Sequence, residues 1–188
     1  MPIAAMDDRK QSLGTPRNAV TIRSEQPSDY EAIDDLFAPL MGQEVANLVR
    51  DLRRSANYVP DLALVAVEER NVVGHILLSY ATLQGTEQLP VLLLSPLGVR
   101  AEYQRRGVGS ALVRAGLDRA TSREEPMVVV EGVPTFYPRL GFERARSHGI
   151  EPPHLEIPDD AWMVRLLPSY STRYRGRIVY PPAFDAFY

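Results

Sequence analysis

A glycine-containing turn between two apolar segments constrains this chain most. Residues 91–99 read VLLLSPLGV, an apolar run of strand length, and residues 108–119 carry apolar side chains at helical spacing. The turn between them includes QRRGVG at residues 104–109. A strand, a turn and a helix start in this order aim several backbone N–H groups at one point, where the helix dipole favours negative charge. Glycine has no Cβ, so the chain can approach a ligand closely there. The sequence therefore predicts a cradle for a diphosphate.

Two common phosphate-binding loops do not match this turn. A P-loop needs Gly-x-x-x-x-Gly-Lys followed by Ser or Thr, and no lysine stands at the required place after Gly107. A dinucleotide fingerprint needs a third glycine, where this chain has Leu112. The pattern Gln/Arg-x-x-Gly-x-Gly/Ala, in contrast, fits residues 104–109 without strain.

Composition argues against several other classes of function. The 188 residues carry a net charge of −3 and no cysteine. A mildly acidic chain is a poor candidate for nucleic-acid binding, and without cysteine there is no disulfide, thiolate metal site or cysteine nucleophile. No apolar run reaches the roughly 18 residues of a membrane span, and residues 1–15 lack an apolar signal core. We therefore expect a cytoplasmic protein without metal, nucleic-acid or membrane contacts.

The hydrophobic periodicity predicts an alternating α/β chain. The length favours one domain over residues 19–188, behind a flexible leader at residues 1–18, and late prolines predict an irregular C-terminal part. A capping box at Ser28 and Glu31 is expected to begin the first helix. The expected strands lie at residues 20–23, 62–67, 72–83, 91–99, 127–131, 141–144, 161–166 and 178–180, and the expected helices at 28–37, 43–55, 108–119 and 134–140.

The segment from Leu97 to Leu112 resembles the GNAT superfamily of acetyl-CoA-dependent N-acetyltransferases. A second matching segment is VVVEGVPTFYPRLGF at residues 128–142, a valine-rich strand followed by an aromatic-Tyr-x-x-x-Gly-Phe pattern. The chain also contains GHI at residues 74–76 and WMV at residues 162–164. Together these segments look like those of the YhbS-like branch of the superfamily. The resemblance covers about residues 20–166. It implies an α/β (α+β) GNAT fold, in which helices flank a mixed, mostly antiparallel sheet and two strands splay apart at the cofactor site.

The resemblance also implies a cosubstrate, acetyl-CoA, and a reaction without a metal. Backbone amides from Arg106 to Ser110 are expected to hold the pyrophosphate, with arginines nearby meeting its remaining charge. The pantetheine arm is expected to pair with exposed strand backbone, and an N–H near Val99 to polarise the thioester carbonyl. Ser95-Pro96 predicts a bulge in the strand just before Leu97, because proline donates no hydrogen bond to the ladder. The expected cofactor-binding residues are Leu97, Gly98, Val99, Gln104, Arg105, Arg106, Gly107, Val108, Gly109 and Ser110, with Arg100 and Arg114 as further candidates for phosphate contact.

Three side chains are candidates for the two proton-transfer roles, the general acid and the general base. In the family a tyrosine at the position of Tyr137 donates a proton to the coenzyme A thiolate, and a phenol with a pKa near 10 suits a thiol with a pKa of about 8.5. The alternative for Tyr137 is a core aromatic beside Phe136 and Phe142. Glu131, at the end of a buried strand, is the first candidate for the general base and Glu44 the second. For Glu131, a carboxylate satisfied by backbone N–H groups is an equal alternative.

The acceptor is the least defined part of the prediction. The resemblance places its site in residues 37–57 and 148–188, where aromatic and basic side chains suit an anionic or aromatic amine, a buried strand, or contacts between copies in a homodimer. His148 and His154 are candidates to line this site, whereas His75, in an apolar strand, is expected to be a core or edge residue. The expected reaction is acetylation of a primary amine of a small molecule or peptide by direct attack in a ternary complex. The alternative is a non-catalytic acyl-CoA-binding or sensing module.

Overall fold

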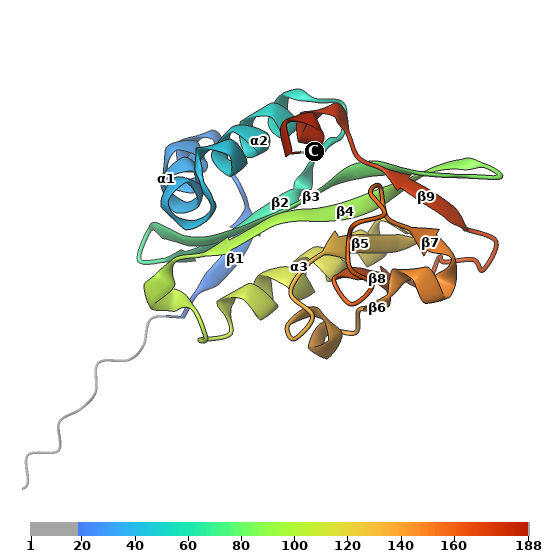
Figure 1. Ribbon diagram of the computed structural model, residues 1–188. Coiled ribbons are helices and arrows are strands. Elements are labelled where there is room, and N and C mark those ends of the chain that lie inside the picture. The colour runs from blue at the N-terminus through green and yellow to red at the C-terminus, as the bar shows by residue number, and fades with distance from the viewer. Residues whose placement is uncertain (1–18, 188) are drawn as a thin grey trace, which may run out of the picture.

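The computed structural model describes residues 19–187, which form a mixed β-sheet with helices on both faces (Figure 1). The expected flexible leader, residues 1–18, lies outside the described residues. The strands are β1 (Thr21–Ser24), β2 (Tyr58–Glu68), β3 (Asn71–Gly85), β4 (Gln88–Val99), β5 (Met127–Glu131), β6 (Glu143–Arg144), β7 (Ile150–Glu151), β8 (Trp162–Leu166) and β9 (Gly176–Val179). The α-helices are α1 (Tyr30–Met41), α2 (Gln43–Arg54) and α3 (Val108–Ser122), and short 3-10 turns are η1 (Pro27–Asp29), η2 (Ala101–Tyr103), η3 (Tyr137–Leu140), η4 (Ala145–His148) and η5 (Pro182–Phe187).

Antiparallel hairpins make the centre of the sheet. The strand order is β1-β2-β3-β4-β5-β8-β6, and β9 pairs with β3 and β7. The turn between β2 and β3 places Glu69 and Arg70 at φ 48° and 73°, a two-residue turn with positive φ at both positions that matches the twist of the hairpin. Parallel pairing joins β4 to β5 and β7 to β9, and the other ladders are antiparallel. The expected mixed, mostly antiparallel sheet is confirmed.

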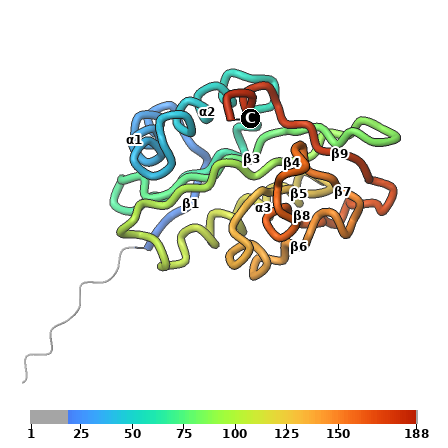
Figure 2. The backbone as a smooth tube through the Cα atoms, viewed as in Figure 1, coloured from blue at the N-terminus to red at the C-terminus, as the bar shows by residue number. Residues whose placement is uncertain are grey.

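Helices bury both faces of the sheet, which is why its central strands read as nearly continuous apolar runs. Alternate residues of β2 face opposite layers: Leu64 packs in the cluster that includes Leu112 of α3, and Val65 packs with Phe37 of α1. The approach of α1 is close, since a Cβ at Gly98 would lie 2.6 Å from Phe37 Cε1. The chain then returns to the α1–α2 side, so that the C-terminal turn η5 lies beside α2 (Figure 2).

The parallel strands β4 and β5 diverge where the sheet meets α1 and α2. Their ladder consists of Leu92 opposite Val128 and Leu93 opposite Val129, and both strands continue beyond it. The register of β4 against β3 shifts between Leu94 and Leu97, which flank the cis Ser95–Pro96 peptide bond. The expected bulge at Ser95-Pro96 and the expected splayed strands are therefore both present.

Several local predictions were wrong in detail. The capping box lies not at Ser28 and Glu31 but at η1, where Asp29 Oδ2 accepts from the Gln26 N–H at 2.7 Å, and no side chain of the described residues caps α1 itself. The reason is that η1 inserts a tight turn ahead of the helix. The helix expected at residues 134–140 is a 3-10 turn that begins at Tyr137. The late strand expected at residues 178–180 lies at Gly176–Val179 and pairs with the far end of β3.

Candidate active site

A cavity of about 620 Å³ opens where β4 and β5 diverge. The strands supply one side, the segment after β5 a second, and α1, α2 and η5 the side that lies over the sheet. Its lining residues are Leu40, Met41, Val45, Leu48, Leu94, Ser95, Pro96, Leu97, Val99, Gln104, Glu131, Gly132, Val133, Phe136, Tyr137, Phe184 and Phe187. The structure thus brings the end of β4, the proton-transfer candidates Tyr137 and Glu131, and part of the glycine loop to one cavity.

The glycine loop ends in an open helix N-terminus. Gly107 is the N-cap of α3 at φ 85°, a left-handed conformation that glycine adopts without strain. The Ala111 N–H donates to the Gly107 carbonyl at 2.9 Å, so the N–H groups of Val108, Gly109 and Ser110 precede the helical hydrogen-bond series. No side chain caps this end of α3, and its first turn contains no acidic residue. Such an end suits an anion, and it therefore fits a phosphate group.

The four candidate arginines lie in different surroundings. Arg105 and Arg106 are exposed on the loop, and the Arg106 guanidinium lies 4.9 Å from the centre of the Tyr103 ring. Arg100 is held away from this role, because its Nε donates to the Val72 carbonyl at 2.8 Å. Arg114 lines a separate surface hollow with Arg139 and Arg165. Arg105 and Arg106 are thus the two of the four that stay near the glycine loop.

The ladder geometry of β4 fixes where its backbone groups point. The Arg100 N–H donates to the Val73 carbonyl at 2.9 Å, and Val99 is the Cα partner of Gly74. Because hydrogen-bonded and non-hydrogen-bonded pairs alternate along an antiparallel ladder, the N–H and C=O of Val99 point away from β3. The Val99 carbonyl accepts from Gln104 Nε2 at 3.0 Å. The Val99 N–H therefore faces the opening between β4 and β5, as does that of Leu97.

Tyr137 lies at the inner end of the cavity, packed between aromatic rings. Its exposed fraction is 6%, and its ring makes edge contacts with Phe136 and Phe142 at centroid distances of 4.9 Å and 5.3 Å. Burial raises the pKa of its phenol well above the ordinary value, which keeps the proton on the oxygen at neutral pH. Gly132 makes room for this ring, since a Cβ there would overlap it. Tyr137 is therefore a packed aromatic residue that lines the cavity, with a phenol that is protonated at neutral pH.

Of the candidate bases and the histidines in the described part of the chain, only Glu131 lines the cavity. Glu131 ends β5 and lines the cavity, whereas Glu44 of α2 is not among the described lining residues. None of the histidines, which all lie within residues 19–187, lines the cavity: His75 is buried against α1, His148 bonds Glu143 at 3.0 Å, and His154 lines a hollow with Asp185. In the same range, no group of three or more His, Asp or Glu side chains is placed to hold a metal ion, and no helix is long and apolar enough to span a membrane.

A buried cluster of charged residues joins α2 to the sheet. Side chains of α2 line the cavity. The Glu25 carboxylate accepts from Arg53 at 2.8 Å and 3.0 Å, from Tyr58 Oη at 2.7 Å, and lies 2.7 Å from His75 Nε2. Burial alone would raise the pKa of Glu25, but the hydrogen bonds from His75 and Arg53 outweigh it and lower the pKa to about 2. Burial lowers the pKa of His75, because it disfavours the charged imidazolium by more than the hydrogen bond and charge of Glu25 favour it. His75 is therefore neutral at pH 7.

Some residues of the cavity were not identified from the sequence. Gly132 went unnoticed, although a glycine directly after a buried strand and ahead of a proline turn was a usable signal. Met41, at the end of α1, and Phe187, in η5, line the same cavity although they are far apart in the chain. The segments expected to form the acceptor side contained both residues, but no local pattern joins them.

Comparisons with known proteins agree with this geometry. A family described as "Acetyltransferase (GNAT) domain" matches residues 21–145. The chain is 36% identical over 163 residues to the N-acetyltransferase YjhQ of Escherichia coli (strain K12), covering 84% of this chain and 90% of YjhQ. The solved structure of the GNAT family N-acetyltransferase YhbS from Escherichia coli in complex with CoA superposes with a TM-score of 0.84 at 30% identity, over 93% of this chain and 96% of that one. A GNAT family acetyltransferase from Brucella melitensis, solved in complex with acetyl-CoA, superposes with a TM-score of 0.72 at 25% identity, over 89% and 99%. The chain belongs to the GNAT family of N-acetyltransferases, in the branch that includes YhbS and YjhQ.

Proposed function

We propose that this enzyme transfers the acetyl group of acetyl-CoA to a primary amine, by direct attack in a ternary complex. The observation that carries the proposal is the single cavity in which the open backbone of β4, Glu131 and Tyr137 meet. The two structural relatives solved with CoA or acetyl-CoA support the choice of donor. A cytoplasmic location belongs to the same proposal, because acetyl-CoA is available there.

The donor would lie along the open side of β4. The N–H groups of Val108, Gly109 and Ser110 would hold the pyrophosphate, with Arg105 and Arg106 beside them. The pantetheine arm would pair with the N–H groups of Leu97 and Val99 in the manner of an added strand. A fixed N–H at Val99 would also stabilise negative charge on the thioester oxygen during attack.

The transfer needs three proton movements. Glu131 would accept a proton from the acceptor ammonium, directly or through water, so that the neutral nitrogen attacks the carbonyl carbon. The N–C bond forms as the C–S bond breaks, and the Tyr137 hydroxyl would give its proton to the departing sulfur. The nitrogen would then lose its second proton, through water, to the Tyr137 oxygen, which leaves a neutral amide and restores the phenol. Burial raises the pKa of the Tyr137 phenol, so its hydroxyl is protonated at neutral pH. The same rise makes the phenol a weaker acid, so its proton would move only as negative charge develops on the sulfur.

Thiol release from acetyl-CoA across a panel of primary amines tests this proposal. We expect amine-dependent release by the wild-type protein and a loss of about 100-fold in kcat for Tyr137→Phe, the order of magnitude of one general acid. Binding of acetyl-CoA, measured by calorimetry, should be the same for both proteins. Tight binding of acetyl-CoA with no release for any amine would favour the alternative, a non-catalytic acyl-CoA-binding module.

A further inference from the structure

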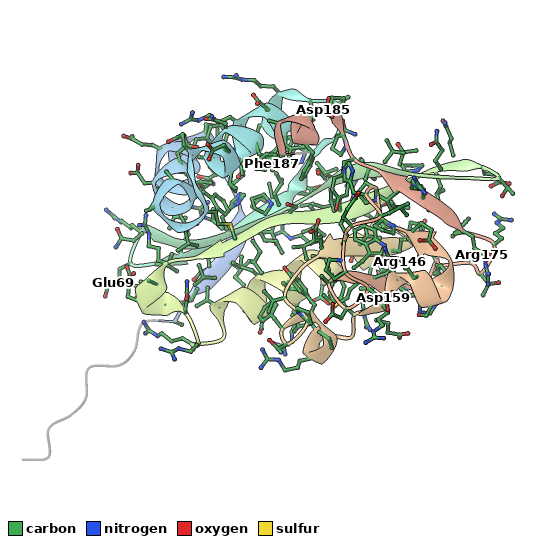
Figure 3. All side chains as sticks on the ribbon, in the orientation of Figure 1. Glu69, Arg146, Asp159, Arg175, Asp185 and Phe187 are labelled. Carbon is green, nitrogen blue, oxygen red and sulfur yellow. The ribbon has the colours of Figure 1, made fainter. Side chains whose placement is uncertain are left out.

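The side of the cavity formed by α1, α2 and η5 is an apolar wall. α1, α2 and η5 each contribute two side chains: Leu40 and Met41, Val45 and Leu48, Phe184 and Phe187. Phe187 lies in the C-terminal turn over the sheet, beside α2 (Figure 3). The three segments are distant in the sequence, so the wall exists only in the folded chain.

Exposed apolar side chains concentrate at this cavity. Within residues 19–187, five large apolar side chains are exposed, and three of them line the cavity: Met41 at 49%, Val133 at 60% and Phe187 at 39%. Exposed apolar surface that gathers around a cavity is typical of a binding site, because a ligand with an apolar surface removes that area from water. The wall thus suits a ligand with an apolar body.

The charge at the cavity has one sign. Of the described residues that line it, Glu131 alone is charged. A carboxylate attracts an ammonium group and repels a second carboxylate, and a ligand carboxylate here would find no lining arginine or lysine among the described residues. The late arginines that suggested an anionic acceptor lie in other surface hollows, Arg173 and Arg175 in one and Arg177 in another. The cavity thus favours a cationic group over an anionic one.

We propose that the acceptor is a hydrophobic monoamine, with an amine as its only charge and an aromatic or branched aliphatic body. This rests on the proposed acetyl transfer and adds the class of acceptor to it. The ammonium would approach Glu131 at the end of β5, and the body would lie against Met41 and Phe187. After Glu131 removes the first proton, the nitrogen forms the N–C bond, the C–S bond breaks, and the sulfur takes the Tyr137 proton. The second proton of the nitrogen then returns, through water, to the Tyr137 oxygen.

Three matched amines test the acceptor class on the wild-type protein. 2-Phenylethylamine has the apolar body alone, phenylalanine adds a carboxylate to it, and ethanolamine keeps the amine but loses the body. With saturating acetyl-CoA, we expect kcat/KM for 2-phenylethylamine to exceed that for each of the other two amines by at least about tenfold. Calorimetry of the protein saturated with coenzyme A should show the same order of affinities without turnover.

Two charge substitutions test whether the apolar wall causes the preference among the amines. Met41→Arg places a cation in the apolar wall, whereas Leu155→Arg makes the same change at a side chain that is 66% exposed and does not line the cavity. Met41→Arg should lower kcat/KM for 2-phenylethylamine about tenfold and raise it for phenylalanine. Leu155→Arg should change neither value. Because Met41 is itself half exposed, its substitution is compatible with folding.

The outcomes separate the acceptor class from the reaction. Thiol release that is fastest with ethanolamine or phenylalanine would overturn the acceptor class and leave acetyl transfer standing. Faster turnover of hexanoyl-CoA than of acetyl-CoA, with no preference among the amines, would also overturn it, since the wall would then hold the donor's acyl chain. Binding of 2-phenylethylamine in the predicted order, with no thiol release for any amine, would overturn acetyl transfer and support the ligand class.

Discussion

The ring of Tyr137 lies against Gly132, so the catalytic proposal depends on a residue without a side chain. Gly132→Ala adds a methyl group that overlaps the ring, and the ring cannot easily move, because Phe136 and Phe142 contact its edges. We expect Gly132→Ala to lower kcat by about as much as Tyr137→Phe and to cost about 1–3 kcal/mol of unfolding free energy. Tyr137→Phe, which keeps the ring, should change unfolding free energy by less than about 1 kcal/mol. Urea unfolding and thiol release on the two variants check this. Full activity in Gly132→Ala would contradict the placement of the hydroxyl.

The buried Glu25 cluster makes stability depend on pH. The lowered pKa of Glu25 stabilises the folded state above the ordinary glutamate pKa, and this contribution is lost as the pH falls from about 5 toward 2. The lowered pKa of His75 adds a loss that begins as the pH falls through about 6.5, since the unfolded histidine then takes up a proton. The unfolding free energy from urea titrations should therefore fall from pH 7 to pH 5 and fall further to pH 3.

Glu25→Gln is the variant that isolates this effect. It leaves Arg53 buried without its carboxylate, and we expect a loss of about 3 kcal/mol at pH 7. Its stability should also decline less than that of the wild type below pH 5, because the titrating group is gone. Parallel pH profiles for the two proteins would show that Glu25 does not carry the acid sensitivity.

At the scale of elements, the N-terminus of α3 is where the pyrophosphate of the donor is proposed to bind. Gly109→Glu places a carboxylate in the first turn, where phosphate oxygens are proposed to bind, and we expect acetyl-CoA affinity to fall at least about tenfold. Ser122→Glu makes the same charge change at the other end of α3, at an exposed position, and should leave the affinity unchanged. Calorimetric titration with acetyl-CoA measures both. Equal affinities for the two variants would place the pyrophosphate elsewhere.

Local sequence signals predicted the elements that carry the donor site. Gly107 and Gly109, between an apolar run and a helical pattern, define a turn and a helix start within a few residues, so neither depends on distant packing. The bulge at Ser95-Pro96 was equally predictable, because a proline excludes a regular ladder. The capping box was predicted at Ser28 and Glu31 rather than at Gln26 and Asp29, since neighbouring polar residues compete for that role within one turn. The two-residue strand β7 is too short to show any periodicity.

At the scale of the whole molecule, the acceptor side depends on contacts between distant segments. Met41 and Phe187 line one cavity because the chain crosses the sheet and returns to α2 after β9. No local sequence pattern predicts that these two distant segments come together. The late aromatic residues were equally compatible with a buried strand or a contact between copies. The fold class was accessible through the resemblance, but the apolar wall emerged only from the assembled structure.

A structure of the protein bound to coenzyme A tests the central claim most directly. The account predicts the pyrophosphate on the N–H groups of Val108–Ser110, the pantetheine arm paired with the open side of β4 at Leu97 and Val99, and the sulfur within hydrogen-bonding reach of the Tyr137 hydroxyl. A complex in which the arm lies outside the opening between β4 and β5, or in which the sulfur points away from Tyr137, would contradict it.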